Sequence, residues 1–282
     1  MIKENIAPVV IPAENIHPFE GHPYKVLDNE EMNALTKSIQ ENGILDPLMV
    51  RPIENSDGEY EIISGHRRFH AAQKAGITEI PAFIKPVSRD EAAIMLVDSN
   101  MHRERILPSE KAFAYKLKYD ALSHQGTSRQ VGAKLRTSEE MAVTADDSAR
   151  QIQRYIRLTN LIPALLDMMD EGRIAFSVGV ELSFLDDELQ QTVLDACEEN
   201  DCTPSYSQAV RMHKAANEGT LDPDGICEIL SEEKANQREK VTISVRSMEK
   251  FVKSPDPDRV KNYIMKACDH YHRFLMRQRE AR

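Results

Sequence analysis

Near residue 90 the pattern of the sequence changes, and this change limits the possible folds more than any other feature. Before it, short apolar runs alternate with prolines, glycines and two stretches of helical spacing, which is typical of a small α+β unit. After it, helical spacing continues to about residue 235, with breaks at single prolines and glycines. We therefore predict an α+β domain over residues 1–97 and an all-α domain over residues 98–235.

Local signals define the elements expected in the first domain. Asp57-Gly58 between two apolar runs is a hairpin signal. Gly43 and Gly76 stand where helix C-terminal caps are expected. The strands are predicted at residues 9–11, 47–53, 60–63 and 80–84, and the helices around residues 32–39 and 66–74.

The last segment, residues 236–282, begins with an alternating apolar pattern and continues as a helix from about Pro257. Apolar residues recur in that helix at spacings of four and three, the rhythm of a helix-packing seam. A helix this short does not pair stably alone. We predict a strand–helix dimerisation segment; packing of the seam against the chain's own helices is the alternative. The strand residues are Val241, Ile243 and Val245, and the seam residues are Val260, Ile264, Ala267, Tyr271 and Phe274.

The net charge of −10 argues at first against nucleic acid as a partner, because phosphate binding usually leaves a basic footprint. The charges are segregated, however. Residues 98–160 carry 11 Lys and Arg against 8 Asp and Glu, whereas residues 161–240 carry 6 against 18. A basic face can therefore exist on this acidic chain.

The cysteines and the lengths of the apolar runs indicate the cellular compartment. The four cysteines are irregularly spaced and lack a C-x-x-C pair, so we expect free thiols and neither a disulfide framework nor a zinc site. No run of about eighteen apolar residues occurs, and no signal-peptide pattern opens the chain. We expect a cytoplasmic protein with no membrane partner.

The sharpest local signal is Ser64-Gly65-His66-Arg67-Arg68, where a predicted strand runs through glycine directly into a predicted helix. Glycine permits close backbone approach, the first amides of a helix lack intrahelical acceptors, and two arginines stand at the opening turn. This combination favours anion binding; an arginine pair on an ordinary surface turn is the alternative.

A second cluster, Asp98 to Arg105, follows a helical stretch. Asn100 and Arg103 lie one turn apart and could face the same phosphate or metal-bound phosphate. Ser109 is expected to cap the next helix because Pro-Ser-Glu is a good helix start.

A third element has the pattern of a DNA-reading helix. A short helix over residues 137–145 is followed by an Asp-Asp turn and by Ser148, which can cap a helix through Leu158. One face of that helix is apolar and the opposite stripe is basic and polar without an acid. Arg and Gln can pair with base edges in the major groove; a solvated charged face is the alternative. The predicted DNA-binding residues are Lys134, Arg136, Ser148, Arg150, Gln151, Gln153, Arg154 and Arg157.

In this order, the three elements resemble the ParB/RepB family of partition proteins, over most of the chain. Asp46 to Arg51 resembles the first nucleotide-contact motif, with Asp46 in place of the usual Gln. Residues 65–72 resemble the arginine-rich box, and residues 99–110 the third motif. The resemblance implies a ParB/sulfiredoxin-like N-terminal domain, a helix-turn-helix domain, and nucleotide-binding residues at Arg51, Gly65, His66, Arg67, Arg68, Asn100, Arg103 and Glu104.

The resemblance also implies partners and a cellular role. It predicts CTP with Mg²⁺ as the bound nucleotide, a specific and palindromic double-stranded DNA site, and a homodimer that closes into a clamp. A ParA-type ATPase would be the partner, and the protein would be associated with the nucleoid. Family members usually carry acids where this chain has His66 and Ser99. Serine and neutral histidine bind magnesium or orient water less well than carboxylates, so nucleotide binding is favoured over turnover, with a weak CTPase as the upper bound.

Other functions are weighed against this one. A helix-turn-helix transcription regulator of a plasmid or mobile element, with a vestigial nucleotide site, would have a similar sequence. Sulfiredoxin chemistry requires a cysteine in the glycine–arginine box, and residues 64–72 contain none. A nuclease should show clustered metal ligands, whereas the acids are scattered. His66, His70 and His102 are assigned surface or packing roles, and no metal ligand is assigned.

Overall fold

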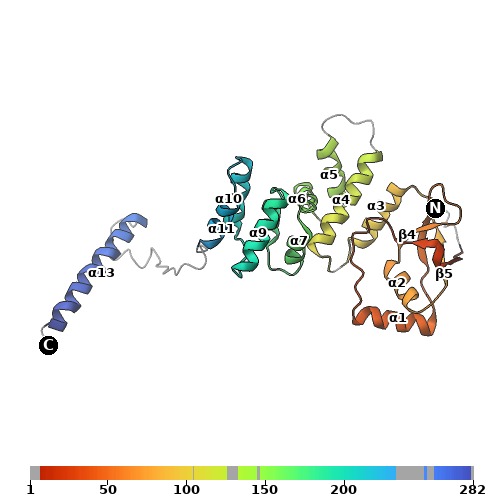
Figure 1. Cartoon of the computed structure of the whole chain (residues 1–282), viewed down its shortest axis with the longest axis horizontal. Helices are drawn as coiled ribbons and strands as arrows, with labels where there is room; N and C mark the ends of the chain where they lie inside the picture. The colour runs from red at the N-terminus through yellow and green to blue at the C-terminus, as the bar shows by residue number, and fades with distance from the viewer. Residues whose placement is uncertain are drawn as a thin grey trace. The chain divides into compact units, whose positions relative to one another are not determined.

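The computed structural model describes residues 7–103, 105–125, 133–144, 147–232, 251–252 and 257–280 (Figure 1). The chain forms two compact units, residues 1–232 and residues 233–282. The predicted N-terminal domain and nearly all of the predicted helical domain therefore belong to one unit.

The first unit begins with a five-stranded mixed sheet in the order β1-β5-β3-β4-β2. β3 pairs antiparallel with β4, which confirms the hairpin predicted from Asp57-Gly58, and parallel with β5. β1 pairs antiparallel with β5, and the short β2 pairs parallel with β4. The bounds are β1 Val9–Pro12, β2 Ile16–His17, β3 Leu48–Pro52, β4 Tyr60–Ser64 and β5 Glu79–Ile84, with a 3-10 turn, η1, at Ala13–Asn15.

Two hydrophobic cores form around β4. Ile62 packs with residues of α1 (Glu30–Asn42) and α2 (His66–Lys74). The next residue, Ile63, packs with residues of α3 (Arg89–Asn100) and α4 (Pro108–Gln125). Because successive side chains of a strand point to opposite faces, β4 joins the two cores directly. The predicted domain boundary at residue 97 lies inside α3.

The start of α4 differs from the prediction that Ser109 caps it. The helix begins at Pro108, so Ser109 lies in its first turn. Glu110 accepts the amide of Leu107 at 3.0 Å, and Asp170 accepts both the amide and the hydroxyl of Ser109, at 3.0 and 2.5 Å. Pro108 at the first helical position places the cap at Leu107, two residues upstream of the predicted cap Ser109.

The rest of the first unit consists of the helices α5 to α11, which succeed one another along the chain (Figure 1). A third, larger core lies among the later helices, and a small cluster of Tyr115, Met141 and Ile152 joins α4, α5 and α6. Helix α5 begins four residues before its predicted start at residue 137. The bounds are α5 Ala133–Thr144, α6 Ala149–Leu158, α7 Pro163–Asp170, α8 Phe176–Leu182, α9 Asp187–Glu199, α10 Tyr206–Asn217 and α11 Pro223–Ser231.

In the second unit, the described elements are a short turn at residues 251–252 and the helix α13, Pro257–Glu280. The start of α13 confirms the prediction near Pro257. The predicted strand over Val241 to Val245 lies outside the described residues. No helix in the described ranges is long and apolar enough to span a membrane.

Candidate anion pocket and nucleic-acid interface

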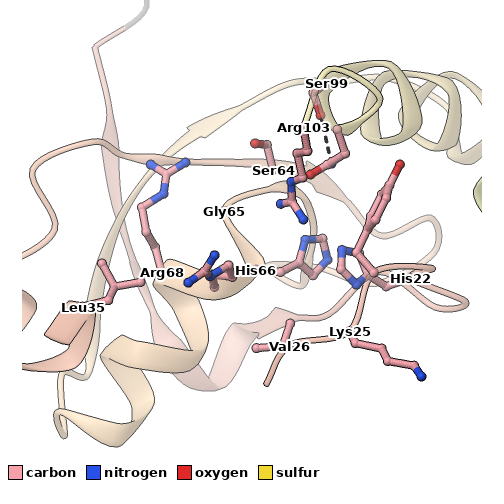
Figure 2. A pocket seen from close by; sticks show the side chains of 13 residues that line it. His22, Lys25, Val26, Leu35, Ser64, Gly65, His66, Arg68, Ser99 and Arg103 are labelled. Atoms are coloured by element: carbon pink, nitrogen blue, oxygen red, sulfur yellow. Dashed lines mark hydrogen bonds between the residues drawn. The ribbon is translucent and has the colours of Figure 1, made fainter. Parts of the chain in front are cut away.

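A cavity of about 330 Å³ lies where the N-terminus of α2 meets the end of α3 (Figure 2). The loop between β2 and α1 supplies a third wall. The cavity therefore unites the predicted glycine–arginine box with the predicted Asn100–Arg103 cluster. Its lining residues are His22, Tyr24, Lys25, Val26, Leu35, Ser64, Gly65, His66, Arg67, Arg68, Ser99, Asn100 and Arg103.

Gly65 makes the close turn from β4 into α2. Its φ of 107° is a left-handed conformation that favours glycine, and a Cβ there would lie 2.9 Å from Cγ of Leu48. Gly65 is the N-cap residue and has no side chain to accept from the first amides of α2. These amides lie at the positive end of the helix dipole, which favours an anion at this position.

Four cationic side chains line the cavity, and three of them are already paired with carboxylates. Arg67 contacts Glu31 at 3.0 Å, and Arg68 contacts Asp46 at 2.5 Å. Lys25 is likewise paired, and its ammonium points away from the cavity (Figure 2). Arg103 forms no ion pair with a described residue, so it is the cation most available to an anionic ligand.

His22 and His66 stack against each other in the wall of the cavity, with ring centroids 3.7 Å apart (Figure 2). Burial, with a smaller contribution from the positive charge of Arg103, lowers the pKa of His66 to about 3 and that of His22 to about 4. Nε2 of His66 lies 3.2 Å from the amide nitrogen of Phe19 and accepts its hydrogen. Both rings are therefore neutral at physiological pH.

Tyr24 is buried at the same wall, with 3% of its surface exposed. The guanidinium of Arg103 lies 5.1 Å from its ring centroid. Its hydroxyl is buried and has no hydrogen-bond partner among the described residues, and burial raises its pKa. A buried hydroxyl without a partner is costly in a folded chain, so this atom is a donor that a ligand or water could satisfy.

The side-chain amide nitrogen of Asn100 is hydrogen-bonded within the protein. Nδ2 donates to the carbonyl of Leu96 at 2.7 Å and to Oγ of Ser99 at 3.3 Å. No described residue donates to its side-chain oxygen Oδ1. Asn100 is thus fixed by its own helix and offers an acceptor to the cavity.

Arg51 does not lie at this cavity, contrary to the prediction. It is 4% exposed, its Nε donates to Glu61 at 2.8 Å, and it lines a separate cavity of about 440 Å³. The physical reason is the register of the hairpin, which places Arg51 directly opposite Glu61. Glu104, also predicted to bind nucleotide, lies outside the described residues.

The sequence analysis missed the loop that forms the third wall, which contributes His22, Tyr24 and Lys25. Prolines around these residues gave the segment the pattern of a connector. The signal that could have found it is the pair of His22 and Tyr24 on either side of Pro23.

Hydrogen bonds hold this loop at both ends. The amide of Glu20 donates to Glu61 at 3.0 Å, next to the bond from Phe19 to His66. At the other end, the amide of Lys25 donates to Glu110 of α4 at 2.8 Å. The loop therefore connects the cavity to the first turn of α4.

Asp147, two residues before the start of α6, is held in place by α4. The hydroxyl of Tyr115 donates to Asp147 at 2.6 Å, and Lys111 pairs with the same carboxylate at 2.5 Å. Ser148 caps α6 by accepting the amide of Gln151 at 3.2 Å, as predicted. Ile152 is fully buried, so the apolar face of α6 is turned to the core.

The polar stripe of α6 is uneven in exposure. Ser148, Arg150 and Gln153 are exposed, whereas Gln151 and Arg154 are half-buried and hydrogen-bonded to each other at 3.2 Å. Arg154 also lies over the ring of Phe176. Lys134 and Arg136 belong to α5, but their side chains lie outside the described part of the structure.

Arg157, the last residue of the stripe, is engaged within the protein. Its guanidinium carbon lies 4.0 Å from the ring centroid of Phe184, and Nη2 donates to the carbonyl of Ser183 at 3.0 Å. These contacts to α8 and its C-terminus favour a packing role.

His66, His70 and His102, which were assigned surface or packing roles, have different surroundings. His66 lies in the cavity wall, His70 pairs with Asp28 at 3.0 Å, and His102 is exposed. Within the described ranges, no three metal-ligating side chains form a cluster. The four cysteines are free, with Cys197 buried and Cys227 and Cys268 exposed.

Comparison with known proteins gives matches along most of the chain. Residues 2–101 match the ParB N-terminal domain. The chromosome-partitioning protein Spo0J of Thermus thermophilus is 30% identical over 251 residues, covering 86% of this chain and 87% of that protein.

Two crystal structures of C-terminally truncated ParB from Caulobacter crescentus are also similar. The one complexed to the centromeric parS site is 20% identical, with a TM-score of 0.41, covering 79% of this chain and 98% of that one. The one complexed with CTP-gamma-S is 23% identical, with a TM-score of 0.32, covering 66% and 98%. With the family match over residues 2–101 and the Spo0J relative along most of its length, this chain belongs to the ParB family of chromosome-partitioning proteins.

Proposed function

We propose that this protein is a sequence-specific DNA-binding partition protein, which binds a centromere-like site through α5 and α6 and a nucleotide in the anion cavity. It would act as a homodimer that closes into a clamp on DNA and works with a ParA-type ATPase. Chromosomes and plasmids are both candidate replicons.

The observation that carries the nucleotide function is the composition of the cavity. The open amides of α2, an Arg103 with no ion pair to a described residue, and the adjacent Arg67 and Arg68 together favour a polyphosphate. The volume of about 330 Å³ is in the usual range for small-molecule sites. CTP is the nucleotide that the family resemblance implies.

The DNA function is supported by the form of α6. A capped helix with a buried apolar face, held to α4 through Asp147, can present a fixed polar stripe to the major groove. Arg150 and Gln153 are the exposed side chains of the types that pair with guanine and adenine edges. Arg154 would need to leave Phe176 to take part.

The test of the nucleotide function is calorimetric titration of the full chain with CTP, ATP and GTP, each with Mg²⁺. We expect selective binding of CTP. Arg103→Ala should abolish it, whereas Arg105→Ala, which changes an exposed arginine outside the cavity lining, should leave it intact.

One observation favours a second candidate, a helix-turn-helix regulator with a vestigial nucleotide site. Arg67 and Arg68 are already paired with Glu31 and Asp46, as they would be in a cavity that no longer receives a ligand. Absence of binding to all three nucleotides, with and without cognate DNA, would select this regulator.

A further inference from the structure

We propose that the cavity binds its nucleotide without a divalent cation, with His66 acting as a hydrogen-bond donor to the phosphates. This inference rests on the proposed nucleotide-binding function and narrows its ligand to the metal-free nucleotide. His66 stands where family members usually place an acid, so the chain would have exchanged a metal-binding or water-orienting group for a phosphate-binding one.

The cavity lining does not suit magnesium. Mg²⁺ at phosphate sites is usually held by one or two carboxylates together with substrate oxygens. None of the described residues that line the cavity is Asp or Glu. The oxygens they offer from side chains near the glycine–arginine box are neutral, those of Ser64, Ser99 and Asn100.

The described acids that neighbour the lining residues already have partners; Glu31, for example, pairs with Arg67 at 3.0 Å. Asp98 accepts from the ammonium of Lys118 at 2.5 Å. Glu110 accepts two backbone amides, at 2.8 and 3.0 Å. Asp46 is paired with Arg68. Recruiting one of these carboxylates to a metal would break a contact that holds a helix, a loop or an arginine in place.

The contacts of His66 fix which ring nitrogen carries the proton. A backbone amide can only donate, so Nε2 is the acceptor of the hydrogen bond from Phe19. A neutral imidazole then carries its hydrogen on Nδ1. The stacked ring of His22 restrains the orientation of His66. Nδ1–H can donate to a phosphate oxygen, but it cannot bind a cation while protonated.

Arg103 supplies the countercharge that a metal ion would otherwise provide. It lines the cavity without an ion pair to a described residue, and its positive charge acts on both histidines. A divalent cation entering the same cavity would be repelled by this charge. The anionic ligand, by contrast, would find arginine, amide and imidazole donors together.

The test is titration of the full chain with CTP in excess Mg²⁺ and again in excess EDTA. We expect the two dissociation constants to differ by less than about tenfold, which corresponds to about 1.4 kcal/mol of binding free energy. A loss of about tenfold or more in EDTA would overturn the inference. Absence of CTP binding in both buffers would instead refute the proposed nucleotide function, and this inference with it.

Two matched variants locate the effect at residue 66. His66→Glu should make CTP binding depend on Mg²⁺, with at least about a tenfold loss in EDTA, because it restores a carboxylate. His66→Gln, which keeps a neutral donor, should bind equally in both buffers. If His66→Glu also binds equally well with and without the metal, residue 66 does not set the metal requirement. The wild-type titration tests the main inference even if a variant fails to fold.

Discussion

The ammonium of Lys25 lies 3.1 Å from a carboxylate oxygen of Asp170, so a residue of the cavity loop is tied to the end of α7. The same carboxylate accepts the amide and hydroxyl of Ser109 in the first turn of α4. Three segments that are distant in sequence therefore meet at one nearly buried carboxylate, whose side chain is 7% exposed.

Asp170→Ala is expected to lower the free energy of unfolding by about 1–3 kcal/mol, because it leaves the amide and hydroxyl of Ser109 without their acceptor. Urea denaturation would measure the change. Asp167→Ala is the control: Asp167 pairs with the same Lys25 but is 63% exposed, so its loss should cost less than about 1 kcal/mol. Equal losses in both variants would contradict the central role of Asp170.

Gly65→Ala is expected to destabilise the protein by more than about 1 kcal/mol, because a Cβ adds strain at positive φ and a clash with Leu48. Gly21→Ala is the matched control. Gly21 also has positive φ, but nothing lies within 4 Å of its added Cβ. Thermal unfolding of the two variants should show the larger fall in melting temperature for Gly65→Ala; the reverse order would place the constraint outside the cavity turn.

Stability should fall as the pH is lowered from about 6.5 towards 4. The pKa of His66 is about 3 and that of His22 about 4 in the folded chain, whereas unfolded histidine has a pKa near 6.5. In this window the unfolded chain binds protons that the folded chain does not. Each histidine therefore lowers the free energy of unfolding by up to ~1.4 kcal/mol for each pH unit of acidification.

Urea midpoints measured across this range would check the effect, with His66→Gln as the comparison. The variant should show a shallower dependence on pH, because one of the two depressed groups has been removed. An unchanged slope in the variant would assign the pH dependence to other residues.

Arg150→Ala is expected to weaken binding to the specific DNA site by about 1–3 kcal/mol and to non-specific DNA much less, if Arg150 contacts a base edge. Fluorescence anisotropy with the two kinds of duplex would measure both. Arg157→Ala should instead lower the stability of the protein, because it removes the contacts to Ser183 and Phe184. Equal losses on both duplexes for Arg150→Ala would assign that residue to phosphate contacts.

Deletion of residues 257–282 is expected to convert a dimer into monomers, since it removes α13 and its exposed apolar side chains. Sedimentation equilibrium of the full and shortened chains would measure the change. A dimer that survives the deletion would place the dimer interface outside residues 257–282.

The elements that could be predicted were those with a local cause. The helix at residues 66–74 follows from a strand entering a glycine, and its bounds were predicted to the residue. The hairpin follows from Asp57-Gly58. The cap at Ser148 follows from a short polar side chain before an amphipathic stretch.

The parts that could not be predicted depend on contacts between distant segments. The wall formed by His22 and Tyr24 exists because the loop is bonded to Glu61 and Glu110, neither of which is near it in sequence. Arg51 was predicted to bind nucleotide because of its motif, but the register of β3 and β4 places it opposite Glu61, with which it forms an ion pair. The packing of Arg157 depends on α8, which no pattern within α6 indicates.

Glu110 and Lys111 are adjacent in the first turn of α4, yet they serve different parts of the protein. Glu110 holds the loop that lines the cavity, and Lys111 holds Asp147, two residues before the start of α6. Neighbouring residues of a helix project about 100° apart, so one rigid helix fixes the position of both regions. A displacement of α4 must therefore change the cavity wall and the orientation of α6 together, which makes this helix a common reference for the two proposed binding sites.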